Sequence, residues 1–241
     1  MKMKKERTGT KTQPVSLVSL VDPSSPVAEQ YRTIRTNLQF ASSADQQVQT
    51  LVVTSSGPSE GKSLTSANLA VVFAQTGQNV LLVDADMRKP TIHKTFQLNN
   101  EAGLNTVLST GVSLEETAQK TTVENLSILT SGPKPPNPSE LLGSEKMNQI
   151  MGEARDLFDI VVFDMPPVVT VTDAQIMSSK VDGTLLVARE NWTIKDALSQ
   201  AKESLDLVQA RILGVIYNGA KQDKDKAYYY FTLTKRSESD D

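Results

Sequence analysis

The sequence contains no cysteine, which excludes disulfide bonds, thiolate catalysis and cysteine-ligated metal sites. The absence of cysteine also favours an intracellular location. No stretch reaches the about 18 apolar residues that a membrane-spanning helix needs. The basic start of the chain is not followed by the apolar core of a signal peptide. We therefore expect a cytoplasmic protein, peripheral to the inner face of the membrane and held there by a partner.

An excess of positive charge is also missing. The chain has 25 Lys and Arg residues against 28 Asp and Glu residues, a net charge of -3, so no nucleic acid is expected as a partner. It has one histidine and one tryptophan, His93 and Trp192, and we interpret both as structural. The composition is otherwise ordinary, with 38% hydrophobic residues, and the length of 241 residues predicts one folded domain.

The chain divides into three parts by composition. Residues 1–25 are rich in Lys, Thr, Ser and Pro and predict a flexible arm that can dock through the stretch SLVSLV. Residues 26–220 are expected to form the domain, beginning with a helix at about 26–42. Residues 221–241 are dense in charge and without helical periodicity, which predicts a flexible tail. The first helix carries one apolar stripe, formed by Val27, Tyr31, Ile34 and Leu38.

Six short apolar runs are expected to be buried strands: TLVVTSS, NVLLVDAD, NLSILTS, DIVVFDMPP, GTLLVARE and ILGVIYNG. Amphipathic segments lie between most of them, such as SLTSANLAVVFAQTG, SELLGSEKMNQIMGEARDLF and IKDALSQAKESLDLVQA. This alternation predicts an α/β fold with a doubly wound, mainly parallel β-sheet flanked by helices. Ligands of such sheets bind beyond the carboxyl ends of the strands.

The segment TLVVTSSGPSEGKSLTSANLA combines a strand, a glycine-containing turn and a helix, which is the context of a P-loop. Backbone N–H groups from Gly57 to Ser63 would form an anion nest at a helix N-terminus. Lys62 would reach the β and γ phosphates, and the Ser63 hydroxyl would ligate Mg²⁺. The pattern GxxxxGK[ST] is imperfect, because its first glycine falls on Ser56; a Ser/Gly turn that only caps a helix is the alternative. The predicted nucleotide-binding residues are Gly57, Pro58, Ser59, Glu60, Gly61, Lys62, Ser63 and Leu64.

Acidic residues end two of the expected strands. Asp84 and Asp86 are two positions apart, so both carboxylates project to one side if the strand persists. Asp164 ends DIVVFDMPP, in the position of a Walker B acid that orders a metal through water. A single acid at a strand end is usually a turn or cap residue. Two acids on one face favour a cation between them, and three such acids in a P-loop protein make a functional cation site the better interpretation.

The combination of SSGPSEGKS, LLVDADMRKPTIHKTF, GPKPPNPSELL, DIVVFDMPPV and ILGVIYN resembles the bacterial tyrosine kinases that regulate capsule and exopolysaccharide synthesis. The resemblance covers residues 26 to 230. Those enzymes carry a Walker A motif, a Walker A′ motif of the form hhhDxDxR and a Walker B motif of the form hhhDxPP, and this chain has all three. Ser59 departs from the family, which often has glycine there, and we expect this to tune binding.

The resemblance implies an ATP- and Mg²⁺-dependent protein-tyrosine kinase, an ATP:protein-tyrosine phosphotransferase. It implies Asp84 as the base toward the acceptor tyrosine. An ordinary Asp and Tyr differ by about 6 pKa units, roughly 8 kcal/mol, so Asp84 would act late in a loose transition state. Asn218 resembles the base-side asparagine of related ATPases, with a turn-forming residue as the alternative. The implied catalytic residues are Lys62, Asp84, Asp86 and Arg88, and the residues that the resemblance implies around Mg²⁺ are Ser63, Asp86 and Asp164.

Members of this family end in a tyrosine cluster, which here is Tyr228, Tyr229 and Tyr230. Three adjacent phenols cannot all face one core in a regular helix or strand. This argues against a hydrophobic anchor, and we expect phosphate acceptors that are modified in trans between subunits.

The first expected helix carries an ExxRxxR motif, formed by Glu29, Arg32 and Arg35. Such a pattern usually marks a solvated charged face. In the family that it resembles, the motif joins subunits into a ring, so we expect a homo-oligomer.

The resemblance also implies partners outside the chain: a membrane-spanning modulator that activates the kinase, protein tyrosine substrates and a cognate tyrosine phosphatase. Two other functions stay open. One is a non-kinase P-loop ATPase switch of the partitioning or septum-positioning type, which usually has a signature lysine at the position of Gly57. The other is a catalytically silent regulator in which ATP only assembles a ring.

Overall fold

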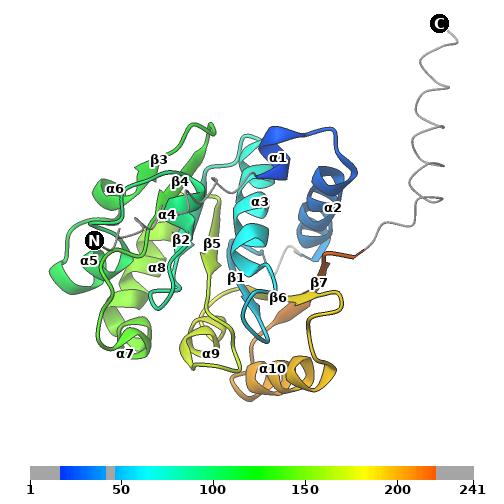
Figure 1. Ribbon diagram of the computed structural model, residues 1–241. Helices are drawn as coiled ribbons and strands as arrows, with labels where there is room; N and C mark the ends of the chain where they lie inside the picture. The colour runs from blue at the N-terminus through cyan, green and yellow to red at the C-terminus, as the bar shows by residue number, and fades with distance from the viewer. Residues whose placement is uncertain (1–16, 42–46, 221–241) are drawn as a thin grey trace, which may run out of the picture.

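The computed structural model of the chain describes residues 17–41 and 47–220. Seven strands form one sheet in the order β3-β4-β2-β5-β1-β6-β7 (Figure 1). Every neighbouring pair is parallel except β3 and β4. The predicted mainly parallel sheet is therefore confirmed. The strands are β1 (Thr50–Ser55), β2 (Val80–Asp84), β3 (Gln119–Lys120), β4 (Leu126–Leu129), β5 (Ile160–Asp164), β6 (Gly183–Arg189) and β7 (Ile212–Asn218).

Helices cover both faces of the sheet, and each face has its own apolar core. One core involves α1 (Val18–Val21), α2 (Pro26–Ala41), α3 (Lys62–Ala74) and α4 (Ile92–Thr95). The other involves α5 (Leu104–Thr110), α6 (Leu114–Thr117), α7 (Pro138–Gly143), α8 (Glu145–Leu157), α9 (Asp173–Ser178) and α10 (Lys195–Leu207). Strand β2 shows why the central strands are apolar throughout, because Leu81 and Val83 enter one core and Val80 and Leu82 the other.

The structure differs from the predicted elements in three places. The expected helix SELLGSEKMNQIMGEARDLF is two helices, because Ser144 is extended and accepts the Met147 N–H as the N-cap of α8. Strand β7 is only partly buried, since it lies at the sheet edge and exposes Val215 and Tyr217. The two-residue strand β3 was not predicted, because two residues show no periodicity.

Residues 17–21, which were assigned to the arm, are folded against α3. Leu17 is buried, and the Ser19 N–H donates to Asn68 Oδ1 at 3.0 Å. The part of SLVSLV that the structure describes, residues 17–21, thus docks, as the sequence allowed. No helix within the described ranges is long and apolar enough to cross a membrane.

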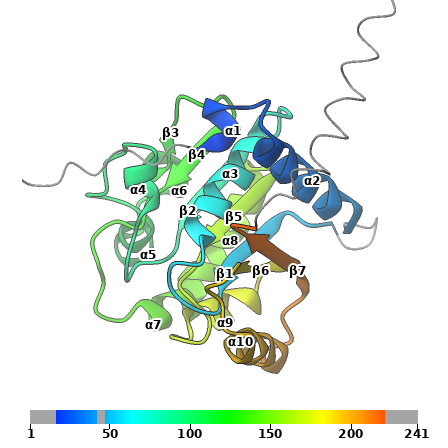
Figure 2. The ribbon, with the colours of Figure 1, turned by 45° about the vertical axis from the view of Figure 1, so that its right-hand side comes forward.

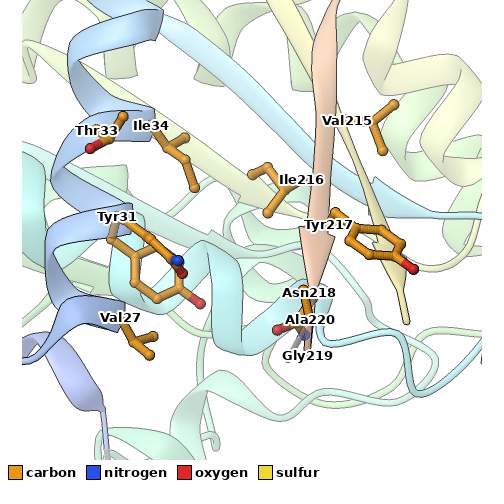
Figure 3. Close-up of a pocket in the computed structure, with 11 residues that line it drawn as sticks. Val27, Tyr31, Thr33, Ile34, Val215, Ile216, Tyr217, Asn218, Gly219 and Ala220 are labelled. Carbon is orange, nitrogen blue, oxygen red and sulfur yellow. The ribbon is translucent and has the colours of Figure 1, made fainter. Parts of the chain in front are cut away.

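Helix α2 lies beside α3 and next to the edge strand β7 (Figures 1 and 2). A groove of about 460 Å³ runs between α2 and β7. Figure 3 shows Ile216 pointing toward α2, with Val215 and Tyr217 on the opposite side of the strand. The groove includes Asn218, the last residue of β7. The side chain of Asn218 is hydrogen-bonded to the P-loop.

Candidate nucleotide and phosphoryl-transfer site

The P-loop connects β1 to α3 and is tightly curled. Gly61 has φ 96°, and a Cβ there would lie 2.0 Å from Asn218 Nδ2, so only glycine fits. Ser59 has φ 63°, which is uncommon for a residue with a side chain. Lys62, predicted to bind phosphate, is the first residue of α3, and the half-exposed Leu64 follows in the same turn. The helix N-terminus thus points at the turn, as an anion nest requires.

The side chain of Glu60 is used within the loop. It is buried, and its carboxylate accepts from the Ser56 N–H at 3.0 Å and from Ser56 Oγ at 2.8 Å. Its negative charge is therefore tied to the start of the loop, and the backbone of Glu60 is the part available for phosphate. These two hydrogen bonds also explain why the turn accommodates serine at position 56, where the general motif has glycine.

Four charged groups meet beyond the carboxyl ends of β2 and β5. Asp84 and Asp164 are register partners on these adjacent strands. Lys62 Nζ lies 2.9 Å from Asp86 Oδ2 and 3.4 Å from Ser63 Oγ. The structure thus brings together the three predicted acids, the P-loop lysine and the predicted metal-binding serine.

The two innermost carboxylates are incompletely satisfied. Asp84 Oδ2 accepts the N–H groups of Thr91 and Ile92, and Asp164 Oδ1 accepts the Ser66 hydroxyl at 3.1 Å. The other oxygen of each acid, Asp84 Oδ1 and Asp164 Oδ2, is buried without a hydrogen-bond partner. Buried polar atoms are nearly always paired, so two unpaired carboxylate oxygens fit a site for a hard cation.

Burial and crowding change the proton affinities of this cluster. Burial, together with the charge of Asp164, raises the pKa of Asp84 to about 8. Burial also raises the pKa of Asp164, although Lys62 opposes this. Burial alone would lower the pKa of Lys62, but the charges of Asp164 and Asp86 outweigh it and raise that pKa. The lysine therefore keeps its positive charge among the acids.

The cation would depend on more than side chains. Within residues 17–41 and 47–220, no group of three or more His, Asp or Glu residues is arranged to hold a metal by itself. Mg²⁺ commonly keeps waters and binds through one or two protein oxygens together with substrate phosphates. The residues present therefore fit Mg²⁺ that arrives with a nucleotide.

The hydrogen bonds of Arg88 go to residues outside the predicted acid cluster. Its guanidinium donates to both oxygens of Asp173 at 2.8 and 2.9 Å and to Ser139 Oγ at 3.1 Å. It therefore joins the loop after β2 to α9 and α7. Asp173 was not among the predicted site residues, because no sequence signal singles it out as the partner of Arg88.

Asn218 does reach the P-loop, because its Nδ2 donates to the Glu60 carbonyl at 3.0 Å. This contact uses only the nitrogen of the amide. The Asn218 side chain therefore supports the turn that holds Gly61, whichever of the two predicted roles it has.

The residues of the ExxRxxR motif have different surroundings. Arg32 Nε pairs with the exposed Glu29 carboxylate at 2.7 Å. Arg35 instead donates to the Val72 carbonyl of α3 at 2.8 Å, so it binds its own domain. The predicted phosphate acceptors Tyr228, Tyr229 and Tyr230 lie outside the described residues.

Known proteins are similar to this chain in sequence and in structure. A family model described as an AAA domain matches residues 49–212. The chain is 47% identical over 216 residues to the tyrosine-protein kinase YwqD of Bacillus subtilis (strain 168), which covers 90% of this chain and 91% of YwqD. The solved kinase domain of the Escherichia coli tyrosine kinase ETK is 33% identical with a TM-score of 0.82, covering 91% of this chain and 85% of that one.

The same fold occurs in more distant proteins. The septum site-determining protein MinD of Pyrococcus horikoshii OT3, solved with Mg-ADP, has a TM-score of 0.61 at 20% identity, covering 73% of each chain. That likeness shows the P-loop fold alone, whereas the match to YwqD extends over nearly the whole of both sequences. The chain therefore belongs to the bacterial tyrosine-protein kinases.

Proposed function

We propose that this kinase binds ATP with Mg²⁺ at the carboxyl edge of β1, β2 and β5 and transfers the γ-phosphoryl group to the tyrosines of its own C-terminal cluster. The observation that carries the proposal is the pair of buried, unpartnered oxygens on Asp84 and Asp164 beside Lys62 and Ser63. Buried polar atoms without a hydrogen-bond partner are costly, and a cation bound beside these two oxygens would offset that cost.

Each residue has a role that follows from its position. The N–H groups of the P-loop and the dipole of α3 hold the phosphates. Lys62, which pairs with Asp86 without nucleotide, would bind the β and γ oxygens of ATP, and Asp86 would then be available to the cation. Ser63, Asp86 and Asp164 would hold Mg²⁺, which when bound neutralises charge on those oxygens.

Asp84 is suited to receive the tyrosine proton late in the transfer. Its pKa of about 8 without ligands is closer to the pKa of a phenol than that of an ordinary aspartate. Positive charge that enters the site favours the ionised carboxylate. The acceptor oxygen would form its bond to the γ phosphorus as the bond from that phosphorus to the leaving ADP breaks, and its proton would pass to Asp84.

The wider setting follows from the family. We propose that subunits associate through α2, with Glu29, Arg32 and Arg35 at or near the interface, and that phosphorylation occurs in trans. A membrane-spanning modulator would hold the kinase at the inner face of the membrane and activate it, and a tyrosine phosphatase would reverse the reaction. The process controlled would be synthesis and export of a capsular or extracellular polysaccharide.

A mixing experiment tests transfer in trans. The acceptor is the Lys62→Met protein with its tyrosines intact, and the donor is a protein with Tyr228, Tyr229 and Tyr230 replaced by Phe. Both are first treated with phosphatase, then incubated with Mg-ATP and mapped by mass spectrometry. We expect phosphate on the acceptor tyrosines only when the donor is present. An unmodified acceptor, under conditions where the wild type modifies itself, would contradict transfer in trans.

A further inference from the structure

Four successive carbonyl groups of the P-loop are held by side chains. Ser55 Oγ donates to the Gly57 carbonyl at 2.7 Å. The next three carbonyls are bound from distant parts of the chain: that of Pro58 by Trp192 Nε1 at 3.1 Å, that of Ser59 by Arg189 Nη1 at 3.0 Å and that of Glu60 by Asn218 Nδ2 at 3.0 Å.

The donors Arg189 and Trp192 belong to one turn, which begins at Arg189, the last residue of β6, and leads to α10. The Arg189 N–H donates to Thr193 Oγ1 at 2.7 Å, and the Trp192 N–H donates to the Arg189 carbonyl at 3.2 Å. The Arg189 guanidinium lies 5.5 Å from the centre of the Trp192 ring, a cation–π distance. The two side chains therefore fix each other as well as the P-loop.

This arrangement orients the peptide groups of the loop. In a trans peptide the C=O and the following N–H point in opposite directions. Donors on the outer side that hold the carbonyls of Pro58 and Ser59 thus turn the N–H groups of Ser59 and Glu60 the other way. Those N–H groups belong to the segment that would form the anion nest.

The strained residue of the loop is one of those held. Ser59 has φ 63°, a left-handed conformation that glycine adopts without strain and that residues with a side chain rarely adopt. Arg189 binds the carbonyl of this same residue. The hydrogen bond from Arg189 therefore offsets the energetic cost of a conformation that serine would otherwise tend to leave.

We propose that Arg189 and Trp192 are positioning residues for the nucleotide, which keep the P-loop in its phosphate-binding conformation before ATP arrives. The inference rests on the nucleotide site proposed above. It gives Trp192 a role beyond the structural one predicted from the sequence. Both residues act through the backbone of Pro58 and Ser59.

The first test measures binding of Mg-ADP by calorimetry to Arg189→Ala and to Trp192→Phe, which keeps an aromatic ring but removes the N–H donor. We expect each variant to bind about three- to tenfold more weakly, the range that one hydrogen bond supplies. The KM for ATP should rise by a similar factor, with kcat within about twofold, because the loop contacts ground state and transition state alike. The control is Lys195→Ala, an exposed residue at the start of α10.

The second test uses Ser59→Gly. Glycine adopts positive φ without strain, so Arg189→Ala should weaken Mg-ADP binding much less in a Ser59→Gly background, measured against Ser59→Gly alone, than in the wild type. The effect of a residue that merely stabilised the fold would not depend on Ser59 in this way.

The outcomes separate the two proposals. A wild type that fails to bind Mg-ADP overturns the nucleotide site itself. A wild type that binds, with Arg189→Ala and Trp192→Phe both within twofold of it, overturns only the positioning role. An equal loss in Lys195→Ala, or a loss from Arg189→Ala that is as large in the Ser59→Gly background as in the wild type, also overturns that role.

Discussion

At the scale of single residues, the site combines groups that stabilise phosphate with groups that destabilise the unliganded protein. Lys62 is paired, whereas Asp84 and Asp164 each keep a buried oxygen without a partner. Unsatisfied buried groups of this kind are common at functional sites, where activity is favoured over stability. The cost should appear as a dependence of stability on pH.

We predict that Asp84→Asn stabilises the unliganded protein and that this stabilisation grows as pH rises. The pKa of Asp84 is raised to about 8 in the folded state from 3.8, so its stabilising contribution is complete below pH 3.8 and is lost as pH rises through about 8. Asparagine stays neutral, and its oxygen can still accept from Thr91 and Ile92. In thermal melts with a chelator and no nucleotide, the Tm advantage of the variant should grow between pH 5 and pH 8.

A Tm difference that stays constant over this range would show that Asp84 does not hold its proton in the folded protein. Phosphoryl transfer should be lost in the same variant. Stability and activity would then change in opposite directions.

At the scale of helices and strands, the predictable features are those that local pattern determines. The continuous apolar runs of β1, β2 and β5 and the turn that contains Gly61 and Lys62 mark the sheet and the P-loop. Contacts between distant segments leave no such pattern. The hydrogen bond from Trp192 to Pro58 joins residues 134 positions apart, and that from Arg88 to Asp173 joins residues 85 positions apart. Neither pair could therefore be inferred from the sequence.

The ion pair that joins the loop after β2 to α9 should be asymmetric in its energetics. Asp173 is fully buried, whereas Arg88 is partly exposed and can be hydrated when it loses its partner. We predict that Arg88→Ala destabilises the protein by about 3 kcal/mol, because it leaves a buried charge, and that Asp173→Ala costs less. Urea denaturation measures both, and the opposite order would contradict this reading.

At the scale of the whole molecule, the arrangement of α2 beside α3 and β7 leaves part of the helix exposed for association. The pair of Arg32 with Glu29 is on that surface, and such pairs contribute less than about 1 kcal/mol to folding. Arg35 is bound to α3, so its replacement would affect the domain as well as any interface.

We therefore predict that Arg32→Ala alone lowers the mass measured by light scattering toward that of a monomer, with little change in Tm. Arg32→Lys, which keeps the charge but not the planar donor group, should give an intermediate mass. An unchanged assembly in Arg32→Ala would identify the motif as an ordinary solvated face.

The most direct test of the account is to incubate phosphatase-treated wild type and Lys62→Met with Mg-ATP and the activating segment of the membrane partner, and to map phosphate by mass spectrometry. In the proposed site Lys62 supplies the positive charge at the β and γ phosphates, so the variant should lose transfer. We predict phosphate on Tyr228, Tyr229 or Tyr230 in the wild type and none in the variant. Equal phosphorylation of the two proteins, or ATP turnover by the wild type with unmodified tyrosines, would contradict the proposed site or its proposed acceptor.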